Sequence, residues 1–452
     1  MWLENFKSKF NGKFSTGSSI KSTFSHDESH HKWVEPDIVF FPESEQDVRD
    51  VLKFASENKI PVTPYGAGTS IEGNPIPLKR GIVVSFEKMN KIIKVYPDDM
   101  MVEVEPGVLY KDLNRDLRIY GLFFPPDPGA NASIGGMLAN NASGTRTVRY
   151  GATKDNVYKC NVALANGDII SVGSLARKSS SGFDLLHLFI GSEGTLGLFT
   201  KAFLKLHGIP AEMSAAVAYF DNVDNAVKTV SDIIMSGLNP AALEFMDENV
   251  IKMLNENEDL NLEEKPCILM EFHGSNRNSL EEEIKSVVEI CKDNKATHFD
   301  SGVGIDERNR LWEARHKTYE VIIRTNPGWK AIIVDTAVPI SKYPELVLYA
   351  KEVTKNVKGY IFGHAGDGNL HAVLVADKED PNSWKKIEEA NEKIVDRGIE
   401  LGGTATGEHG VGIGKIKYLP KEFGEPTVNL MKQIKNSLDP DNILNPGKIF
   451  KF

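Results

Sequence analysis

Hydrophobic residues follow alternating strand and helix periods from residue 36 to residue 207, which predicts short strands and helices in succession. A helix is expected after Ser44, because Ser44 and Asp47 form a capping-box pattern ahead of an apolar stripe at Val48, Val51, Leu52 and Ala55. The same region contains expected strands at 60–63, 82–84, 92–95 and 102–104, an expected helix at 110–117, and a hairpin over 157–172 that turns at Asn166-Gly167.

The pattern changes at Gly208-Ile-Pro210, which indicates a domain boundary. Beyond it, strands at 215–220 and 267–273 alternate with helices at 223–235 and 280–293, so we expect an antiparallel sheet with helices stacked on one face. Two more helices are expected, at 383–401 and 427–438. A chain of 452 residues is too long for one ordinary core, so we expect two or three domains.

The composition, 41% apolar and 26% charged, is that of a soluble globular protein. The net charge of −10 and the absence of a basic block argue against a nucleic-acid partner. Cys160, Cys267 and Cys291 lie far apart, which excludes an iron–sulfur motif and a disulfide framework. Because this cysteine usage indicates a reducing compartment, we expect a cytoplasmic protein.

The N-terminus shows neither a signal peptide nor an apolar run long enough to span a membrane. Trp2, Leu3, Phe6 and Phe10 recur at near-helical spacing with lysines between them. Such a helix either touches a membrane surface, which would make the protein peripheral there, or docks on the protein's own body. We favour docking.

Two histidines flank an expected turn in the segment His364-Ala-Gly-Asp-Gly-Asn-Leu-His371. β-prone residues lie on both sides, at 360–362 and 372–375, and Asp367-Gly368 predicts a two-residue hairpin turn. That turn would pair His364 with His371 on one face, as a bidentate metal site. The alternative is two polar residues on a solvated hairpin.

Glycine loops are the second source of candidate chemistry. The loop at 64–73 follows a strand, and the amides of 66–70 could form a nest for a pyrophosphate, although the loop matches neither the Walker nor the Rossmann pattern. The segment 126–144 has almost no large side chains, and a third glycine turn covers 191–197. Three such loops suggest an extended dinucleotide lying across the first domain.

At this point the chain resembles the flavin-dependent D-2-hydroxyacid dehydrogenases of the vanillyl-alcohol-oxidase superfamily, and within them the cytochrome-type D-lactate dehydrogenase and glycolate-oxidase subunit branch. Seven motifs in family order carry the resemblance: Pro64-Tyr-Gly-Ala-Gly-Thr-Ser70, 133–144, Arg149-Tyr-Gly151, Gly191-Ser-Glu-Gly-Thr-Leu-Gly197, His364–His371, Gly407-Glu-His-Gly410 and Asn445-Pro-Gly-Lys448.

The resemblance implies an α+β fold. An N-terminal segment, 1–35, would precede an FAD-binding domain of two subdomains at 36–208, a cap domain at 209–420 with an antiparallel sheet covered by helices, and a C-terminal segment, 421–452, that returns to the FAD domain. The loops contain no His or Cys, so we expect FAD bound without a covalent link, and we expect His26, His30 and His31 at the surface. The implied cofactor-binding residues are Pro64, Gly66, Ala67, Gly68, Thr69, Ser70, Pro126, Asp127, Ser133, Ile134, Gly135, Gly136, Asn140, Ser143, Gly144, Arg149, Tyr150, Gly151, Glu193, Gly194, Gly197 and Asn445.

The resemblance also implies the chemistry. Glu408 would join His364 and His371 as ligands of a divalent metal, Zn or Mn, and His409 would be the base that takes the substrate's hydroxyl proton. Residues 311–319 read as one helix, with Arg315 as the carboxylate-binding residue and Tyr319 as a weaker catalytic candidate on the same face. The alternatives are an exposed polar turn at 408–409 and a solvated helix arginine.

At two positions this sequence differs from family members in a way that concerns the substrate. Relatives that act on 2-hydroxyglutarate have Lys and Asn at the positions of Ile333 and Val373, so we expect a small monocarboxylate, D-lactate or glycolate. The rivals are a D-2-hydroxyglutarate-type dehydrogenase, an oxygen-using oxidase, a non-redox alkyl-transferring flavoprotein and a non-enzymatic binding module. Electrons would pass to an external acceptor, namely a quinone, a cytochrome, an electron-transfer flavoprotein or a partner subunit. A homodimer is left open.

Overall fold

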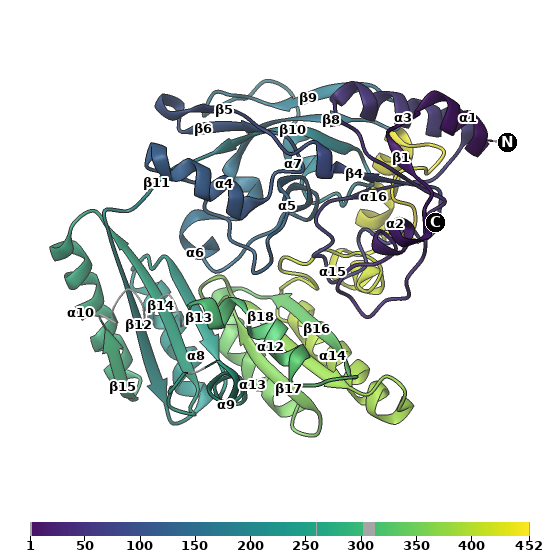
Figure 1. Ribbon diagram of the computed structural model, residues 1–452. Helices are drawn as coiled ribbons and strands as arrows, with labels where there is room; N and C mark the ends of the chain where they lie inside the picture. The colour runs from purple at the N-terminus through teal and green to yellow at the C-terminus, as the bar shows by residue number, and fades with distance from the viewer. Residues whose placement is uncertain (1, 259, 302–311, 452) are drawn as a thin grey trace. The chain divides into compact units, whose positions relative to one another are not determined.

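The computed structural model describes residues 2–258, 260–301 and 312–451, and the chain divides into two compact units (Figure 1). The first unit comprises Met1–Ser143, Ala152–Ile209 and Glu408–Phe452, and the second comprises Gly144–Gly151 and Pro210–Gly407. The C-terminal part of the first unit therefore begins at 408, where the sequence suggested 421. Residues 144–151, which begin with the last glycine of the segment 126–144, fold with the second unit.

The first sheet of the first unit consists of three parallel strands, β2 (Ile38–Phe40), β4 (Ile82–Ser85) and β3 (Val62–Tyr65). Strand β1 (Phe14–Ser15) joins them antiparallel at the β2 edge. Helix α3 (Glu45–Asn58) begins where the sequence predicts, because the Ser44 side chain accepts a hydrogen bond from the Asp47 amide. The apolar stripe of α3 is fully buried in the core that this sheet shares with α1 (Trp2–Lys9). Short helix α2 (Ser18–Thr23) follows β1.

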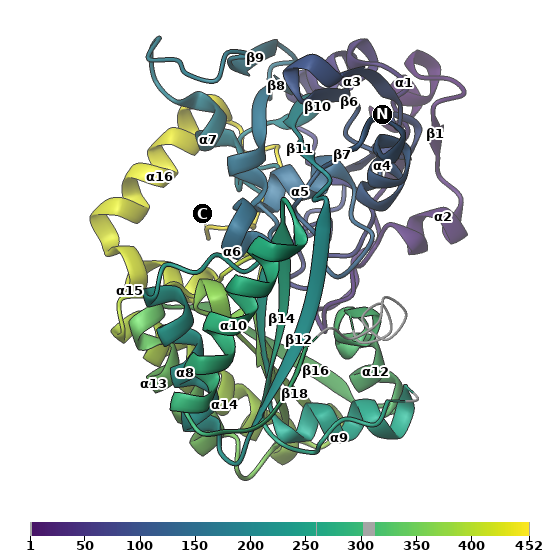
Figure 2. The same cartoon turned by 90° about the vertical axis from the view of Figure 1, so that its left-hand side faces the viewer.

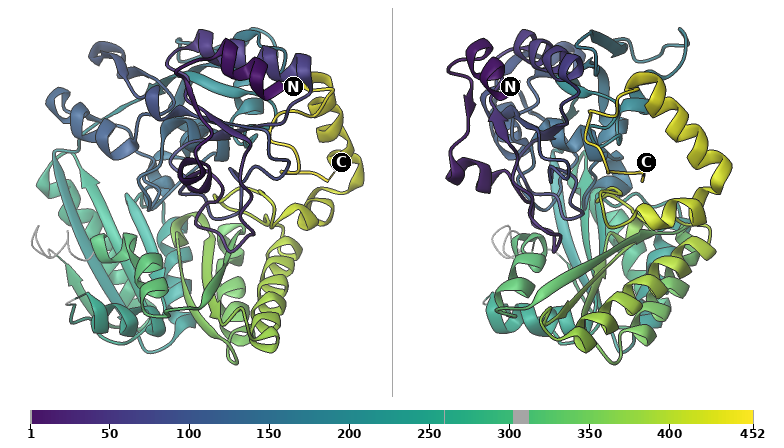
Figure 3. Two further views of the ribbon diagram at one scale, coloured as in Figure 1. Left: turned by 45° about the vertical axis from the view of Figure 1, so that its right-hand side comes forward. Right: turned by 90° about the vertical axis from the view of Figure 1, so that its right-hand side faces the viewer.

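The N-terminal helix α1 docks on the protein's own body, as we favoured (Figure 3). The ring of Phe6, which is 0% exposed, lies 4.6 Å from that of Phe10 and 5.4 Å from that of Phe54 between ring centroids. Phe6 and Phe10 are buried in this core, and Trp2 and Leu3 pack against it half-buried. His26, His30 and His31 are half-buried rather than fully at the surface, because the preceding segment packs against Tyr65 and the loop at 72–74.

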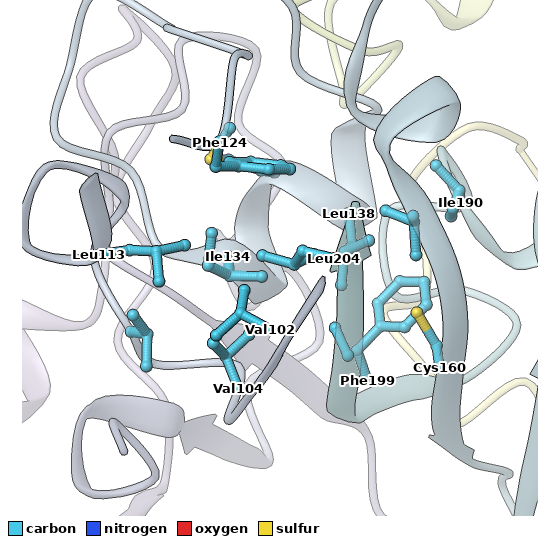
Figure 4. Close-up of a cluster of buried hydrophobic side chains, with 14 of the residues drawn as sticks. Val102, Val104, Leu113, Phe124, Ile134, Leu138, Cys160, Ile190, Phe199 and Leu204 are labelled. Atoms are coloured by element: carbon cyan, nitrogen blue, oxygen red, sulfur yellow. The ribbon is translucent and has the colours of Figure 1, made fainter. Parts of the chain in front are cut away.

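The second sheet of the first unit is antiparallel, in the order β5 (Ile92–Tyr96), β6 (Met101–Val104), β10 (Leu198–Lys205), β8 (Val157–Ala163), β9 (Ile169–Gly173). The predicted hairpin is confirmed, since Ala163 pairs with Ile169 around the Asn166-Gly167 turn. Helices α4 (Tyr110–Leu117) and α5 (Ile134–Asn140) cover the sheet, and Figure 4 shows their Leu113, Ile134 and Leu138 in one apolar cluster with strand residues Val102, Phe199 and Leu204. The remaining elements of the unit are β7 (Leu122–Phe123), β11 (His207–Gly208), α7 (Leu185–Phe189) and α15 (Leu419–Phe423).

The C-terminal residues, yellow in Figure 3, complete the first sheet. After α16 (Glu425–Leu438), the Val62 amide donates to the Ile443 carbonyl at 2.7 Å, and the Asn445 amide donates to the Val62 carbonyl at 2.7 Å. The buried Lys435 ammonium of α16 donates to the carbonyls of Thr195 and Leu444, at 2.8 and 3.0 Å. Residues 443–445 are thus part of the core of the first unit.

The second unit contains a seven-stranded antiparallel sheet in the order β15 (Ala296–Ser301), β12 (Glu212–Phe220), β14 (Cys267–Gly274), β13 (Ala242–Met246), β17 (Lys358–Gly363), β18 (Asn369–Ala376), β16 (Lys330–Ala337). Figure 2 shows helices on both faces, where the sequence suggested one. One face is covered by α8 (Val223–Met235), α10 (Arg277–Asp293), α13 (Tyr343–Val353) and α14 (Pro381–Glu400). The other is covered by α9 (Glu248–Asn257) and α12 (Thr318–Arg324), because the strands bury apolar residues on that side too.

The hairpin between β17 and β18 differs from its prediction. Phe362, not His364, pairs with His371, so the register is shifted and His364 begins a 3₁₀ turn, η6 (Ala365–Asp367), closed by Gly368 at φ 72°. Tertiary packing explains the longer turn: a Cβ on Gly366 would lie 2.7 Å from Val148, and one on Gly368 would lie 2.1 Å from the Val338 carbonyl oxygen. A two-residue turn would lift the loop off these neighbours.

Over residues 2–258, 260–301 and 312–451, no helix combines the length and apolar character that a membrane span requires.

Replacing Phe6 by Ala should lower the free energy of unfolding of the first unit by about 3–5 kcal/mol, because it leaves a cavity in a closed aromatic cluster. The measurement is urea unfolding followed by far-ultraviolet circular dichroism. The matched control is Phe183→Ala, the same substitution at a ring that is 94% exposed, where little change is expected. Equal effects at both positions would contradict the docking of α1.

Candidate functional site

The first glycine loop, which follows β3, presents unused donors. Among the residues that the structure describes, the backbone amides of Ala67, Gly68, Thr69 and Ser70 donate no hydrogen bond to the protein. Gly68 has φ 73°, a conformation that turns successive N–H groups toward one side. Such a nest fits a pyrophosphate, since phosphate oxygens are acceptors.

The second glycine segment lies directly against the first loop. The Ser133 hydroxyl caps α5 by accepting from the Gly136 amide at 3.3 Å, and a Cβ on Gly66 would fall 2.4 Å from that hydroxyl oxygen. Asp127 is buried, with Pro126 beside it. Ile134 and Gly135 complete the tightly packed start of α5, where a Cβ on Gly135 would fall 2.7 Å from Pro106.

Residues at the end of the same segment make hydrogen bonds to Glu408 and His409. Ser143 donates to the Glu408 carboxylate at 2.5 Å, and the Asn140 amide side chain donates to the His409 carbonyl at 3.3 Å. These side chains are largely buried, with exposed fractions of 12% for Glu408 and 16% for His409. The structure thus fixes both residues on the first unit, whereas the alternative of an exposed polar turn would leave them in water.

Two residues that the family resemblance placed at the cofactor, Glu193 and Asn445, also hold the loops together. The Glu193 carboxylate accepts from the amides of Val411 and Gly412, at 2.5 and 2.9 Å, and from the Asn74 side chain at 2.7 Å. Asn445 donates to the carbonyls of Asn74 and Glu193, at 3.0 and 2.7 Å. Gly194 packs on Pro64 and Gly197 on Val162, where a Cβ would fall 2.4 Å from either neighbour.

The interior beneath these loops is strongly polar. Burial raises the pKa of Glu193, although the hydrogen bonds that it accepts oppose this. Burial also lowers the pKa of Lys448 to about 7, while the nearby Glu193 and Asp27 act in the other direction. The Lys448 ammonium donates to the Ile76 carbonyl at 2.6 Å and to the Asn445 side chain at 3.2 Å.

In the second unit, strand register gathers buried polar residues on one face of the sheet. Side chains alternate along a strand, so Glu244 of β13, His371 of β18 and Asp335 of β16 share that face. Glu271 and His273 of β14 lie on the same face further along. Burying so many polar groups in one row is costly unless they pair or bind a ligand, so the part of this face around Glu244, His371 and Asp335 is the candidate site of the second unit.

His364 and His371 lie together despite the changed register, with ring centroids 5.1 Å apart and planes at 88°. Each has a buried carboxylate behind it. The Nδ1 atom of His364 is 2.8 Å from an oxygen of Glu244, and that of His371 is 3.7 Å from an oxygen of Asp335. Metal-binding histidines commonly donate Nδ1 to such a carboxylate, so His364 fits a divalent ion bound through its Nε2 atom, whereas the 3.7 Å separation at His371 is longer than a hydrogen bond.

Arg315 shares the Glu244 carboxylate. Its Nη2 donates to that carboxylate, and its guanidinium carbon lies 4.8 Å from the ring centroid of Phe362. Arg315 is 5% exposed, so it is not the solvated helix arginine of the alternative prediction. Within the described chain, its Nε has no hydrogen-bond acceptor, and a buried unpaired donor of this kind fits a bound carboxylate.

The helix predicted over 311–319 is interrupted. Residues 312–316 are helical, Lys317 is a turn, and α12 begins at Thr318; residue 311 lies outside the described part of the chain. Tyr319 is therefore on a different helical piece from Arg315, and it packs at the edge of the apolar cluster below the polar row. The hydroxyl of Thr318 turns back to the Arg315 carbonyl at 2.8 Å, which accompanies the break.

Three polar residues of this face were not foreseen from the sequence: Glu244, Asp335 and Asn369. Burial raises the pKa of Glu244, but the charge of Arg315 and the interaction with His364 outweigh it, so the pKa of this carboxyl lies below its usual value. Asn369 donates to Asp335 at 2.8 Å, as does Thr406. The sequence does contain a signal that could have identified such residues: a single acidic residue inside an otherwise apolar strand, as in Ala242-Leu-Glu-Phe-Met246.

Comparison with known proteins now identifies the family. Residues 36–173 match the model of an FAD binding domain, and residues 209–449, more than half of the chain, match the C-terminal domain of FAD linked oxidases. A probable mitochondrial D-lactate dehydrogenase of Danio rerio is 40% identical over 442 residues, which cover 97% of this chain and 89% of that protein. The chain belongs to the FAD-linked D-2-hydroxyacid dehydrogenase family.

Other relatives agree with this assignment. The glycolate oxidase subunit GlcD of Bacillus subtilis (strain 168) is 35% identical over 443 residues, 97% of this chain and 94% of that protein. The structure of p-cresol methylhydroxylase shares the fold, with a TM-score of 0.78 at 18% identity, and covers 99% of this chain and 96% of that one. The resemblance inferred from the seven motifs and the predicted fold class are confirmed, and the protein is an FAD-dependent oxidoreductase.

Within this dehydrogenase, the Arg149-Tyr150-Gly151 motif folds with the second unit, as does Gly144. Short helix α6 (Thr147–Tyr150) is attached to β14: Arg149 donates to the His273 carbonyl at 2.9 Å, and the Tyr150 hydroxyl lies 2.8 Å from the His273 Nδ1. Burial lowers the pKa of His273, although Glu271 opposes this effect. Val148 of α6 contacts the turn that follows His364.

Replacing Gly66 by Ala should weaken FAD binding by about tenfold, or about 1.4 kcal/mol, because the new methyl would collide with the Ser133 hydroxyl and deform the nest. The measurement is a fluorescence titration of the flavin-free protein with FAD. Gly208→Ala is the control, since a Cβ there meets nothing within 4 Å. Unchanged FAD affinity in Gly66→Ala would contradict the location of the nest.

Between about pH 7.5 and 10, the free energy of unfolding of the dehydrogenase should rise with pH. It should rise more than that of the Lys448→Met variant. The pKa of Lys448 is about 7 in the folded protein and 10.5 as an ordinary lysine, so the unfolded chain holds the extra proton in this range. Stability rises with pH wherever the unfolded state binds more protons. Urea unfolding at several pH values measures the difference, and parallel curves for the two proteins would refute it.

Proposed function

We propose that the dehydrogenase oxidises a small D-2-hydroxy acid, D-lactate or glycolate, to the 2-oxo acid, with FAD and a divalent metal. The observation that carries this proposal is the buried group in the second unit: two adjacent histidines, each backed by a carboxylate, and an arginine on one of those carboxylates. A charged row of this kind fits a metal and an anionic substrate better than it fits a structural core.

For the metal, we propose His364, His371 and Glu408 as ligands. Glu244 supports His364 by orienting its ring through a hydrogen bond to Nδ1, and the contact between the two rings supports His371. Glu408 is covalently joined to Gly407, which packs so closely on the polar row that a Cβ would fall 2.0 Å from the Asn369 side chain. A bound Zn or Mn ion would lower the pKa of a coordinated hydroxyl group.

Different residues would take the substrate's hydroxyl proton and bind the substrate's carboxylate. His409 would accept the proton of the substrate's hydroxyl, and its location directly after Glu408 supports this role. Arg315 would bind the substrate carboxylate through its Nε, which has no acceptor among the described residues, while Glu244 accepts from its Nη2. FAD, when bound, supplies the acceptor for the hydride that leaves C2 of the substrate.

A small substrate is supported by the two residues that depart from the hydroxyglutarate pattern. Ile333 and Val373 are direct partners across β16 and β18, and Tyr360 is the partner of Val373 on β17. All three belong to or pack on one apolar cluster, so they offer no charge to a second carboxylate. This favours D-lactate or glycolate over a dicarboxylate such as 2-hydroxyglutarate.

The electron acceptor is proposed to be external: a quinone, a cytochrome, an electron-transfer flavoprotein or a partner subunit. Cys160, Cys267 and Cys291 are buried and unpaired, at separate places in the fold, so they do not form a cluster ligand set. The names of relatives support an external acceptor, because one curated protein of Arabidopsis thaliana, 40% identical over 424 residues, is a D-lactate dehydrogenase of the cytochrome type.

Anaerobic mixing with D-lactate or glycolate should bleach the flavin of the FAD-loaded enzyme, and removal of the metal by a chelator should abolish this reduction. L-lactate and D-2-hydroxyglutarate are the comparison substrates and should reduce the flavin far more slowly. Metal analysis of the same sample should find one Zn or Mn ion per chain. Rapid reduction by D-2-hydroxyglutarate, or full activity without metal, would overturn the corresponding part of the proposal.

Replacing Arg315 by Lys should raise KM for D-lactate by about 10–100-fold, the range expected for the loss of a charge-assisted hydrogen bond of about 1.5–3 kcal/mol. Steady-state kinetics with an artificial electron acceptor measure this effect. Arg324→Lys, at an exposed arginine of α12, is the control and should leave KM unchanged. An unchanged KM in Arg315→Lys would argue for a purely structural ion pair.

A further inference from the structure

Glu244 is a fully buried carboxylate that serves two functional side chains at once. One oxygen lies 2.8 Å from the Nδ1 atom of His364, and the other accepts from the Nη2 of Arg315. The residue is 0% exposed and sits in the middle of the second unit's sheet, on β13. The carboxylate therefore cannot turn toward one partner without losing the other.

Each bond has a specific consequence. By accepting from Nδ1, the carboxylate holds His364 in the tautomer whose Nε2 lone pair can bind a metal. By accepting from Nη2, it fixes one edge of the Arg315 guanidinium, which also lies over Phe362. The Nε of Arg315, a buried donor with no acceptor among the described residues, keeps a defined direction because of these two restraints.

We propose that Glu244 is a positioning residue that couples metal binding at His364 to substrate-carboxylate binding at Arg315. The proposal rests on the proposed function, since it assumes that these two side chains bind the metal and the carboxylate. Both ligands use one anchor, so an ordered His364 leaves the carboxylate, and with it Arg315, already in place. Coupling of this kind is reciprocal: each ligand should tighten the other.

The same sheet face supplies a matched control. Glu271 of β14 is 2% exposed, accepts from Arg146 at 3.2 Å, and lies 2.6 Å from the Nε2 of His273. Because Glu271 pairs with Ala242, it is the diagonal cross-strand neighbour of Glu244. Glu244 and Glu271 thus have the same burial and the same kinds of partner, but His273 and Arg146 are not among the proposed ligands.

The test uses full-length, FAD-loaded protein and the variants Glu244→Gln, Glu244→Asp and Glu271→Gln. Calorimetric titration of metal-free protein with Zn²⁺ reports on His364, and titration with pyruvate, with and without Zn²⁺, reports on Arg315. In Glu244→Gln we expect Zn²⁺ affinity to fall about 10–100-fold. Pyruvate affinity should fall about 5–30-fold even without metal, because the neutral amide cannot hold the guanidinium in the same way.

Glu271→Gln should keep both affinities within about threefold of the wild type, while losing a similar amount of stability in urea unfolding. Glu244→Asp, which keeps the charge, should recover part of both affinities. In the wild type Zn²⁺ should tighten pyruvate binding, and in Glu244→Gln this enhancement should disappear.

Two results would overturn the proposal: unchanged Zn²⁺ and pyruvate affinities in Glu244→Gln, or equal losses in Glu244→Gln and Glu271→Gln. A wild-type protein that binds neither Zn²⁺ nor pyruvate would instead refute the proposed function itself. The two failures are therefore distinguishable, because the first is seen in the variants and the second in the wild type.

Discussion

A carboxylate buried inside a sheet must be paired, and this constraint shapes the second unit. Glu244 lies in the middle of seven strands with no access to water, where an unpaired charge would be prohibitively costly. His364 and Arg315 satisfy its two oxygens, and each of them is thereby fixed. The positions of the histidine turn and of the helical residues 312–316 both depend on this one side chain.

The first unit meets a different constraint, because its loops must leave backbone amides unused and still stay rigid. The amides of 67–70 donate no hydrogen bond within the described part of the chain, so other groups hold the loops in place. Glu193, Asn445 and Lys448 do this from below, with hydrogen bonds to backbone groups of neighbouring loops. Rigid loops with amides left to donate are what a preformed phosphate-binding nest requires.

Local sequence patterns predicted the elements well where one element makes its own core contact. Helix α8 has the predicted bounds, and a hairpin turns at Asn166-Gly167 as predicted. The patterns failed where distant residues compete for the same backbone. The turn after His364 is longer than Asp367-Gly368 suggested because Val148 and Val338 pack on its glycines, and the helix around Arg315 breaks at Lys317.

The sequence by itself determined the order of elements, the glycine loops, the family and the residue types of the candidate site, because these depend on local spacing and on motifs. The tertiary structure decided which carboxylates stand behind His364 and His371, that Glu193 and Asn445 brace the loops, and that α6 joins the second unit. The physical reason is burial. Pairing of a buried charge depends on which strands become neighbours, and strand order is set by long-range packing that no short stretch of sequence contains.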